Sequence, residues 1–317
     1  MAGPTRANTS APTVFIDGEA GTTGLEIRER LAHAADIAVR SIDPQNRKDA
    51  SARAQLMSEV DLVVLCLPDD AAKEAVALAD GLGETAPRIV DASTAHRVAA
   101  DWAYGFPELD AAQRAAIIKT KRVSNPGCYP TGAIALLRPL VSAGIVPADH
   151  PITINAVSGY SGGGKSMIEG YEVKKTAPSF ELYGLGLEHK HVPEIEKYSN
   201  LTRRPIFVPS VGNFRQGMLV SVPLHLGTLP GKPSLEDMRT TLAKHYDGAR
   251  LVSVVDAATF KGRIAAEDLN GTDKMQLAVF GNAEHGQAVL VARLDNLGKG
   301  ASGAAVQNIR LMLGLDR

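Results

Sequence analysis

The sequence predicts an α/β protein with two domains, the first built on a parallel sheet and the second an α+β domain built on a mixed sheet. Up to about residue 128, apolar runs alternate with helix-forming segments, a pattern typical of parallel strands joined by right-handed crossovers. Beyond it, strands follow one another with fewer helices, and several alternate in period 2. The chain has 317 residues, 44% of them apolar, which is enough for two cores.

The change of pattern sets the expected domain boundaries. We expect the first domain to span residues 1–128 and to be completed by the C-terminal helix, 299–317, and the second domain to span 129–298. Residues 1–13 lack the apolar core of a signal peptide and are expected to form a loose tail.

Apolar runs bounded by turn residues place the elements of the first half. The expected strands are 13–17, 37–42, 61–67 and 88–91, and the expected helices are 22–34, 50–58, 69–82 and 133–140. In the helix at 22–34 we expect Leu25 and Leu31 to share a buried face.

The second half is expected to be richer in strands. The expected strands are 152–157, 206–208, 218–226, 250–255, 275–280 and 287–295, and helices are expected at 194–198 and 300–315.

Composition narrows the class of partner. The net charge of −1 gives no positive field that would attract nucleic acid or an anionic membrane, and no run reaches the roughly 20 apolar residues of a membrane span. We therefore expect a small-molecule partner, no nucleic acid and no membrane. The chain has only two cysteines, and Cys66 lies in an apolar strand, so we expect a reducing compartment and a cytoplasmic location.

Cys128 is the strongest candidate for catalysis. Pro126 and Gly127 predict a turn immediately before it, and Pro130 suits the first turn of a following helix. The positive end of a helix dipole favours thiolate over thiol, so we expect the pKa of Cys128 to lie below the ordinary value of about 8.5 and the thiol to act as a nucleophile. The alternative is a small buried cysteine that follows a turn.

A glycine-rich loop follows the first expected strand and opens the first expected helix. Its glycines have the spacing G-x-x-G-x-x-G, which offers a pyrophosphate backbone N–H groups, close approach and a helix N-terminus. The context of strand, turn and helix indicates a Rossmann-type dinucleotide site rather than a structural turn. The expected cofactor-binding residues of the loop are Gly18, Glu19, Ala20, Gly21, Thr22, Thr23 and Gly24.

The end of the second expected strand bears on the choice of cofactor. Asp43 suits the ribose hydroxyl of NAD, whereas Ser41, Arg47 and Lys48 suit the 2′-phosphate of NADP. We expect NADP(H). The alternative is that Arg47 and Lys48 only begin a solvated helix.

His189 and His191 are the candidates for proton transfer. In an extended segment the side chains of residues i and i+2 point the same way, and imidazole can accept and donate a proton near neutral pH. We expect no metal site, because no cysteine or carboxylate with ligand spacing accompanies the pair. A structural role for both histidines is the alternative.

Three glycine-rich segments could contact an anionic ligand. Arg215 stands on a glycine-bounded loop, where a guanidinium could grip a carboxylate or phosphate, or could simply face solvent. The loop 158–165 ends a strand and either closes over an anionic substrate or forms a long hairpin. Gly300 lies where the last helix opens, so backbone N–H groups there could face a cofactor.

These segments together resemble the N-acetyl-gamma-glutamyl-phosphate reductases of arginine biosynthesis, in their shorter, second type. The segments that carry the resemblance are 18–24, 125–131, 158–165, 189–195 and 299–303, and the likeness runs from Val14 to the C-terminus. The chain departs from the longer form at 91–97, where that form has an Asp-Phe pair before the arginine. Arg97 matches the family, and the role of His96 stays open.

The resemblance implies a semialdehyde dehydrogenase-like fold and an NADPH-dependent reduction of an acyl phosphate to an aldehyde through a Cys128 thioester. We assign the acid/base role to His189, because the glycine-rich run 184–187 leaves it freer to reach into a cleft, and a supporting or substrate-orienting role to His191, which abuts the expected helix 194–198. The resemblance also implies phosphate as a second product and a homodimer or homotetramer. The further residues that it implies are Pro68, Ser93 and Gly300 for the cofactor, and Arg97, Asn125, Ser158, Gly159 and Arg215 for the substrate.

Three other functions compete with this one. Aspartate-semialdehyde dehydrogenase would share the architecture and chemistry with a shorter substrate. A non-catalytic NADP-sensing protein would keep the fold without needing the Cys128 turn and the histidine pair. A cysteine hydrolase would leave the glycine-rich loop unexplained.

Overall fold

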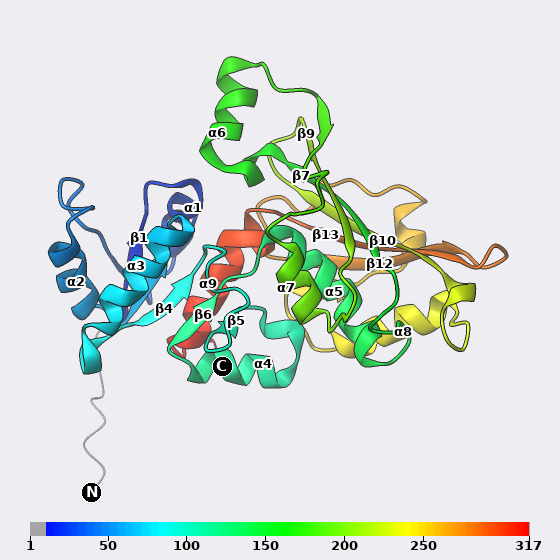
Figure 1. Cartoon of the computed structure of the whole chain (residues 1–317), viewed down its shortest axis with the longest axis horizontal. Helices are drawn as coiled ribbons and strands as arrows, with labels where there is room; N and C mark the ends of the chain where they lie inside the picture. The colour runs from blue at the N-terminus through cyan, green and yellow to red at the C-terminus, as the bar shows by residue number, and fades with distance from the viewer. Residues whose placement is uncertain (1–10, 317) are drawn as a thin grey trace, which may run out of the picture.

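The computed structural model describes residues 11–316, so the first ten residues of the expected tail lie outside it. Figure 1 shows two sheets side by side, with the C-terminal helix α9 (Gly303–Met312) lying between them. A segment that contains the short helix α6 (Gly164–Ile168) stands away from both sheets. Within residues 11–316, no helix is long and apolar enough to cross a membrane.

The first sheet has six parallel strands in the order β2-β1-β3-β4-β6-β5. Because the strands are parallel, their carboxyl ends meet at one edge, which is where ligands bind in open α/β sheets. The elements are β1 (Thr13–Asp17), α1 (Thr22–Ala32), β2 (Ala38–Arg40), α2 (Ala50–Ser58), β3 (Leu62–Leu65), α3 (Asp69–Asp80), η1 (Gly83–Thr85), β4 (Arg88–Asp91), β5 (Ala103–Tyr104), η2 (Pro107–Leu109), α4 (Ala111–Lys119) and β6 (Arg122–Ser124).

Helices cover both faces of this sheet. Successive side chains of β1 point to opposite faces, so they contribute alternately to the two cores. Val14 and Ile16 pack with α1 and α9 on one face, while Phe15 packs with α2 and α3 on the other. The expectation that Leu25 and Leu31 share a buried face is wrong: Leu31 is buried, but Leu25 is 49% exposed. The two lie six positions apart, on different sides of a helix, and Ile27 takes the buried position instead.

The second sheet has seven strands in the order β11-β12-β13-β10-β7-β9-β8. It is mixed, since β7–β9 and β11–β12 are parallel pairs and the other pairs are antiparallel. Helices α5 and α8 pack on it. Its elements are α5 (Cys128–Ser142), β7 (Thr153–Gly159), η3 (Tyr160–Gly163), α6, η4 (Glu169–Lys174), β8 (Phe180–Leu182), α7 (Val192–Tyr198), β9 (Ile206–Gly212), β10 (Met218–His225), η5 (Leu226–Thr228), α8 (Leu235–His245), β11 (Val252–Val254), η6 (Ala257–Phe260), β12 (Met275–Asn282) and β13 (Gln287–Leu294), and η7 (Gly298–Ser302) leads into α9.

The predicted fold class is confirmed: a parallel α/β unit is joined to a unit with a mixed sheet. Helix α9 packs against α1 and α4. The domain boundaries themselves, 1–128 with 299–317 and 129–298, stay a prediction. The sequence pattern missed β5, α4, α6, β8 and α8.

Candidate active site

Cys128 is the first residue of α5, and Gly127 is its N-cap. Thr131 holds the turn, since its backbone N–H and its hydroxyl both donate to the Gly127 carbonyl, at 3.0 and 2.9 Å. A cavity of ≈ 370 Å³ opens in front of the thiol. Residues that line it include Thr22, Thr23, Arg97, Asn125, Cys128, Ser158, Gly159, His189, Lys190, His191 and Gly300.

Burial favours the neutral form of the Cys128 thiol. Burial raises its pKa to about 11, and the charge of Glu194 adds to this rise. The charge of Arg97 and the backbone N–H groups at the start of α5 act in the opposite direction. The expectation of a lowered pKa is therefore wrong, because desolvation of the thiolate outweighs the helix terminus.

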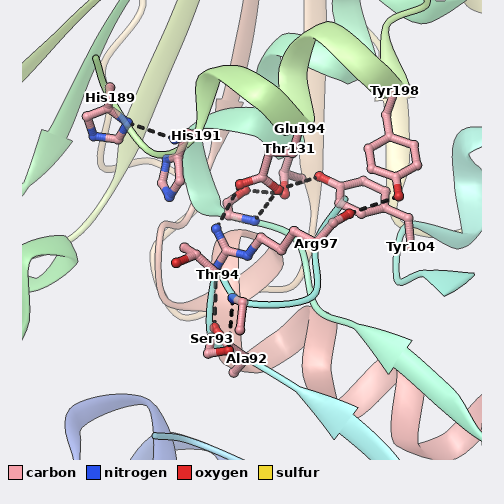
Figure 2. Close-up of polar contacts among 12 residues, drawn as sticks. Ala92, Ser93, Thr94, Arg97, Tyr104, Thr131, His189, His191, Glu194 and Tyr198 are labelled. Atoms are coloured by element: carbon pink, nitrogen blue, oxygen red, sulfur yellow. Dashed lines mark hydrogen bonds and ion pairs between the residues drawn. The ribbon is translucent and has the colours of Figure 1, made fainter. Parts of the chain in front are cut away.

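His189 and His191 line the same cavity as Cys128, and burial favours the neutral form of both rings. Burial and the nearby cation Lys190 lower the pKa of His189 to about 4, and burial together with the charge of Arg97 holds the pKa of His191 well below its ordinary value. The backbone N–H of His191 donates to Nδ1 of His189 at 3.1 Å, so neutral His189 carries its proton on Nε2 (Figure 2). His191 is buried, and its Nδ1 has no hydrogen-bond partner among residues 11–316.

Arg97 reaches the cavity from the loop after β4. Its Nη1 donates to Oε1 of Glu194 at 2.8 Å, and its Nη2 donates to the Ala92 carbonyl at 3.2 Å (Figure 2). Glu194 was not among the residues expected from the sequence. The available signal was an acidic residue in the first turn of an expected helix. The groups that Glu194 binds lie far away in the chain, so the sequence gives no sign that it is buried at the site.

The other expected substrate residues divide into two groups. Asn125, Ser158 and Gly159 line the cavity, although the Asn125 amide also donates to the Ala301 carbonyl at 3.0 Å. Arg215 does not line it. Its side chain is 55% exposed and pairs with Glu172 at 2.8 Å, so its contact with substrate stays a prediction.

A second cavity of ≈ 360 Å³ lies at the glycine-rich loop. Gly18 has a φ of +89°, and a Cβ there would lie 2.3 Å from the Cys66 carbonyl, so only glycine fits. The N-cap of α1, Gly21, makes no side-chain cap, which leaves the first N–H groups of the helix free of a side-chain partner. Gly18 to Gly21 line this cavity while Thr22 and Thr23 line the first. This cradle fits a dinucleotide that reaches from the loop toward Cys128.

The basic residues expected for the cofactor lie at this second cavity. Arg47 and Lys48 line it, whereas Asp43 does not. Ser41 lies close by, and its hydroxyl donates to Glu19 at 2.9 Å.

The remaining expected cofactor residues follow the ends of other strands and helices. Pro68 is the exposed N-cap of α3. Ser93 is buried and donates to Asp91 at 2.7 Å. Gly300 contacts the nucleophile's turn, since a Cβ there would lie 3.0 Å from Cβ of Cys128.

Comparison with known proteins places the chain among semialdehyde dehydrogenases. The semialdehyde dehydrogenase NAD-binding domain matches residues 21–117, and the semialdehyde dehydrogenase dimerisation domain matches residues 128–296. Solved relatives in fold include aspartate semialdehyde dehydrogenase II of Vibrio cholerae, with a TM-score of 0.72 and 17% identity over 96% of this chain and 99% of that one. Aspartate semialdehyde dehydrogenase of Candida albicans, solved with NADP, has a TM-score of 0.65 and 15% identity over the same shares.

Curated relatives in sequence are much closer. The N-acetyl-gamma-glutamyl-phosphate reductases of Brucella ovis and Brucella suis are each 55% identical to this chain over 309 residues, covering 96% of this chain and 99% of theirs. The chain therefore belongs to the family of N-acetyl-gamma-glutamyl-phosphate reductases.

Proposed function

We propose that this chain uses NADPH to reduce N-acetyl-L-glutamyl 5-phosphate to N-acetyl-L-glutamate 5-semialdehyde and phosphate, in arginine biosynthesis. The observation that carries the proposal is the cavity in which Cys128, His189, His191 and Arg97 meet, next to the dinucleotide loop. The 55% identity to reductases of this name supports the choice of substrate.

Cys128 forms the covalent intermediate. Its sulfur attacks the 5-carbonyl carbon, the thiol proton passes to the imidazole pair, and the carbon–oxygen bond to phosphate breaks to give a thioester. The first N–H groups of α5 face the developing oxyanion. Because burial favours the neutral thiol, we place the loss of this proton at the step in which the sulfur attacks the carbonyl.

His189 serves the second half of the reaction. Bound NADPH supplies a hydride to the thioester carbonyl. Because the imidazole pair has taken up the thiol proton, His189 can give its Nε2 proton to the oxygen of the resulting thiohemiacetal and leave the pair neutral. When the carbon–sulfur bond breaks, His189 takes this proton back and the imidazole pair returns it to the Cys128 sulfur, so the aldehyde leaves and the thiol is restored.

Gly18 to Gly24 and the start of α1 would hold the pyrophosphate of NADP(H), with Arg47 and Lys48 at the 2′-phosphate. For the substrate, Arg97, Asn125, Ser158 and Gly159 would contact the acyl phosphate within the first cavity. Arg215 would join them only if its pair with Glu172 opens.

The chain carries a dimerisation domain, and a homodimer or homotetramer is part of the proposal. Exposed apolar side chains on and beside the edge strand β8 support it, since a patch of this kind favours an interface. They are Phe180, Leu182, Leu185, Leu187 and Ile206. We also propose a cytoplasmic location, in keeping with the two unpaired cysteines.

The reverse reaction tests the function directly. Purified protein is given NADP and N-acetyl-L-glutamate 5-semialdehyde, with and without phosphate, and NADPH absorbance is followed. We expect reduction of NADP that depends on phosphate, much slower turnover of aspartate semialdehyde, and none in Cys128→Ser. A preference for aspartate semialdehyde would instead show that the chain acts as an aspartate-semialdehyde dehydrogenase. Tight NADP binding without turnover of either substrate would support the sensor.

A further inference from the structure

We propose that Glu194 is a positioning residue that fixes the Cys128 turn, Arg97 and the histidine pair relative to one another. This inference rests on the proposed function, whereas the hydrogen bonds and contacts behind it do not depend on which substrate binds.

One buried carboxylate joins three distant segments of the chain. Oε1 of Glu194 accepts from Arg97, and Oε2 accepts from the Tyr104 hydroxyl at 2.9 Å and from the Gly127 backbone N–H at 3.1 Å (Figure 2). Glu194 is 1% exposed, so these protein donors replace water around its charge. The carboxylate thus contacts Gly127, the residue immediately before the nucleophile, and Arg97, the cation that lowers the pKa of Cys128.

The same helix ties the histidines into this arrangement. His191 is the N-cap of α7, and Glu194 lies in the first turn of that helix, where a negative charge is favourable. A Cβ on Gly127 would lie within 2.8 Å of Glu194 Oε1 and 2.7 Å of His191 Nε2, so the carboxylate, the imidazole and the turn are in close contact. Because α7 packs against α5, a movement of Glu194 would shift the histidines and Cys128 relative to each other.

A second layer holds the partners of Glu194. The Tyr104 ring stacks on Tyr198 of α7 with ring centroids 3.8 Å apart, and the Tyr198 hydroxyl donates to the Arg97 carbonyl at 2.9 Å. Arg97 and Tyr104 belong to the unit with the parallel sheet, whereas Glu194 and Tyr198 come from the unit with the mixed sheet. The contact therefore sets how the two halves of the cavity face each other.

Glu194 also acts on the charge of the nucleophile. Its carboxylate raises the pKa of Cys128, while Arg97 lowers it. The titratable groups that face the thiol or line its cavity are Arg97, Tyr129, Tyr183, His189, Lys190, His191 and Glu194. Of these, Glu194 is the acid, so its neutral analogue should make the thiolate easier to form.

The test compares Glu194→Gln and Glu194→Asp with Glu196→Gln as the matched control. Glu196 lies on the same helix, and its side chain makes no hydrogen bond or ion pair within residues 11–316. The first readout is the pH dependence of Cys128 alkylation by iodoacetamide without substrate. The second is kcat and KM for each substrate, and thermal unfolding reports on the fold.

We expect Glu194→Gln to alkylate about tenfold faster near pH 8, since each pKa unit below the wild type gives about ten times more thiolate. Its kcat should nevertheless fall at least tenfold, with the KM for NADPH unchanged, because the reacting groups lose their alignment. Glu194→Asp keeps the charge but not the reach, so its alkylation profile should match the wild type while its kcat falls. Glu196→Gln should match the wild type in both readouts.

Two results would overturn the proposal. One is an unchanged alkylation profile together with wild-type kcat in Glu194→Gln. The other is a wild-type kcat in Glu194→Asp. If Glu194→Gln does not fold, this second result is enough by itself to overturn the proposal. A wild-type protein that fails to reduce the acyl phosphate would count against the proposed function, while the alkylation readout would still judge Glu194.

Discussion

The substitution Gly127→Ala adds a single methyl group at the most crowded point of the site. The backbone of Gly127 is extended, with φ −72° and ψ 152°, which alanine adopts freely. The cost therefore comes only from contacts. The new Cβ would lie 2.6 Å from Arg97 Nη1, 2.7 Å from His191 Nε2 and 2.8 Å from Glu194 Oε1.

Ordinary contacts lie at about 3.5–4.0 Å, so each of these groups would have to retreat by about 1 Å. Overpacking of this kind costs about 1–3 kcal/mol of stability. A misplacement of about 1 Å in the reacting groups costs about 10² in rate. We therefore expect kcat/KM to fall by about 10² while the protein stays folded.

The assay is kcat/KM in the reverse reaction, with thermal unfolding measured in parallel. Gly227→Ala is the control, because a Cβ there has no atom within 4 Å. It should keep wild-type kinetics and melting temperature. If Gly127→Ala keeps kcat/KM within about twofold of the wild type, the crowded geometry around Gly127 does not set the rate and the reasoning is wrong.

Three further predictions concern the nucleophile, the cofactor and the proton donor. Cys128→Ser should abolish turnover but still bind NADP, as measured by fluorescence titration, and appreciable residual activity would contradict the thioester. Replacing both Arg47 and Lys48 with alanine should raise the KM for NADPH much more than that for NADH, and equal effects would remove the 2′-phosphate role. His189→Asn should lower kcat by about 10²–10⁴, whereas His191→Asn should act mainly on KM, and pre-steady-state thioester formation would reveal a reversed assignment. Because His189 has a pKa of about 4 and is neutral above it, the wild-type kcat/KM profile should show no loss from its protonation near pH 6.5, only at more acidic pH.

Local chemistry explains which elements the sequence could predict. Helix α2 was expected at 50–58 and spans Ala50–Ser58, because Asp49 caps it by accepting from the Ala52 N–H at 2.8 Å. Helix α8 was missed although its signal was present: Ser234 and Asp237 form a capping box with the spacing S-x-x-D. Strand β5 is too short to leave a periodic pattern.

The site was predictable only where one short segment carries it. The turn before Cys128 and the glycine-rich loop are local, and their residues line the two cavities. Glu194 depends on Arg97, Tyr104 and Gly127, which lie between 67 and 97 positions away, so no local pattern encodes its role. The neutral state of the thiol was missed for a related reason, since the burial that raises its pKa comes from the assembled cavity.

The position of α9 affects how the first domain folds while the chain is being synthesised. Ile309 and Met312 complete the core that Val14, Ile27 and Leu31 begin, so one face of the first sheet is closed by residues that the ribosome adds after the whole mixed sheet. During translation only α1 covers that face, and the apolar side chains that α9 will bury are open to solvent or to chaperones while the mixed sheet is being synthesised. Closure of the first core therefore has to wait until the mixed sheet has been synthesised.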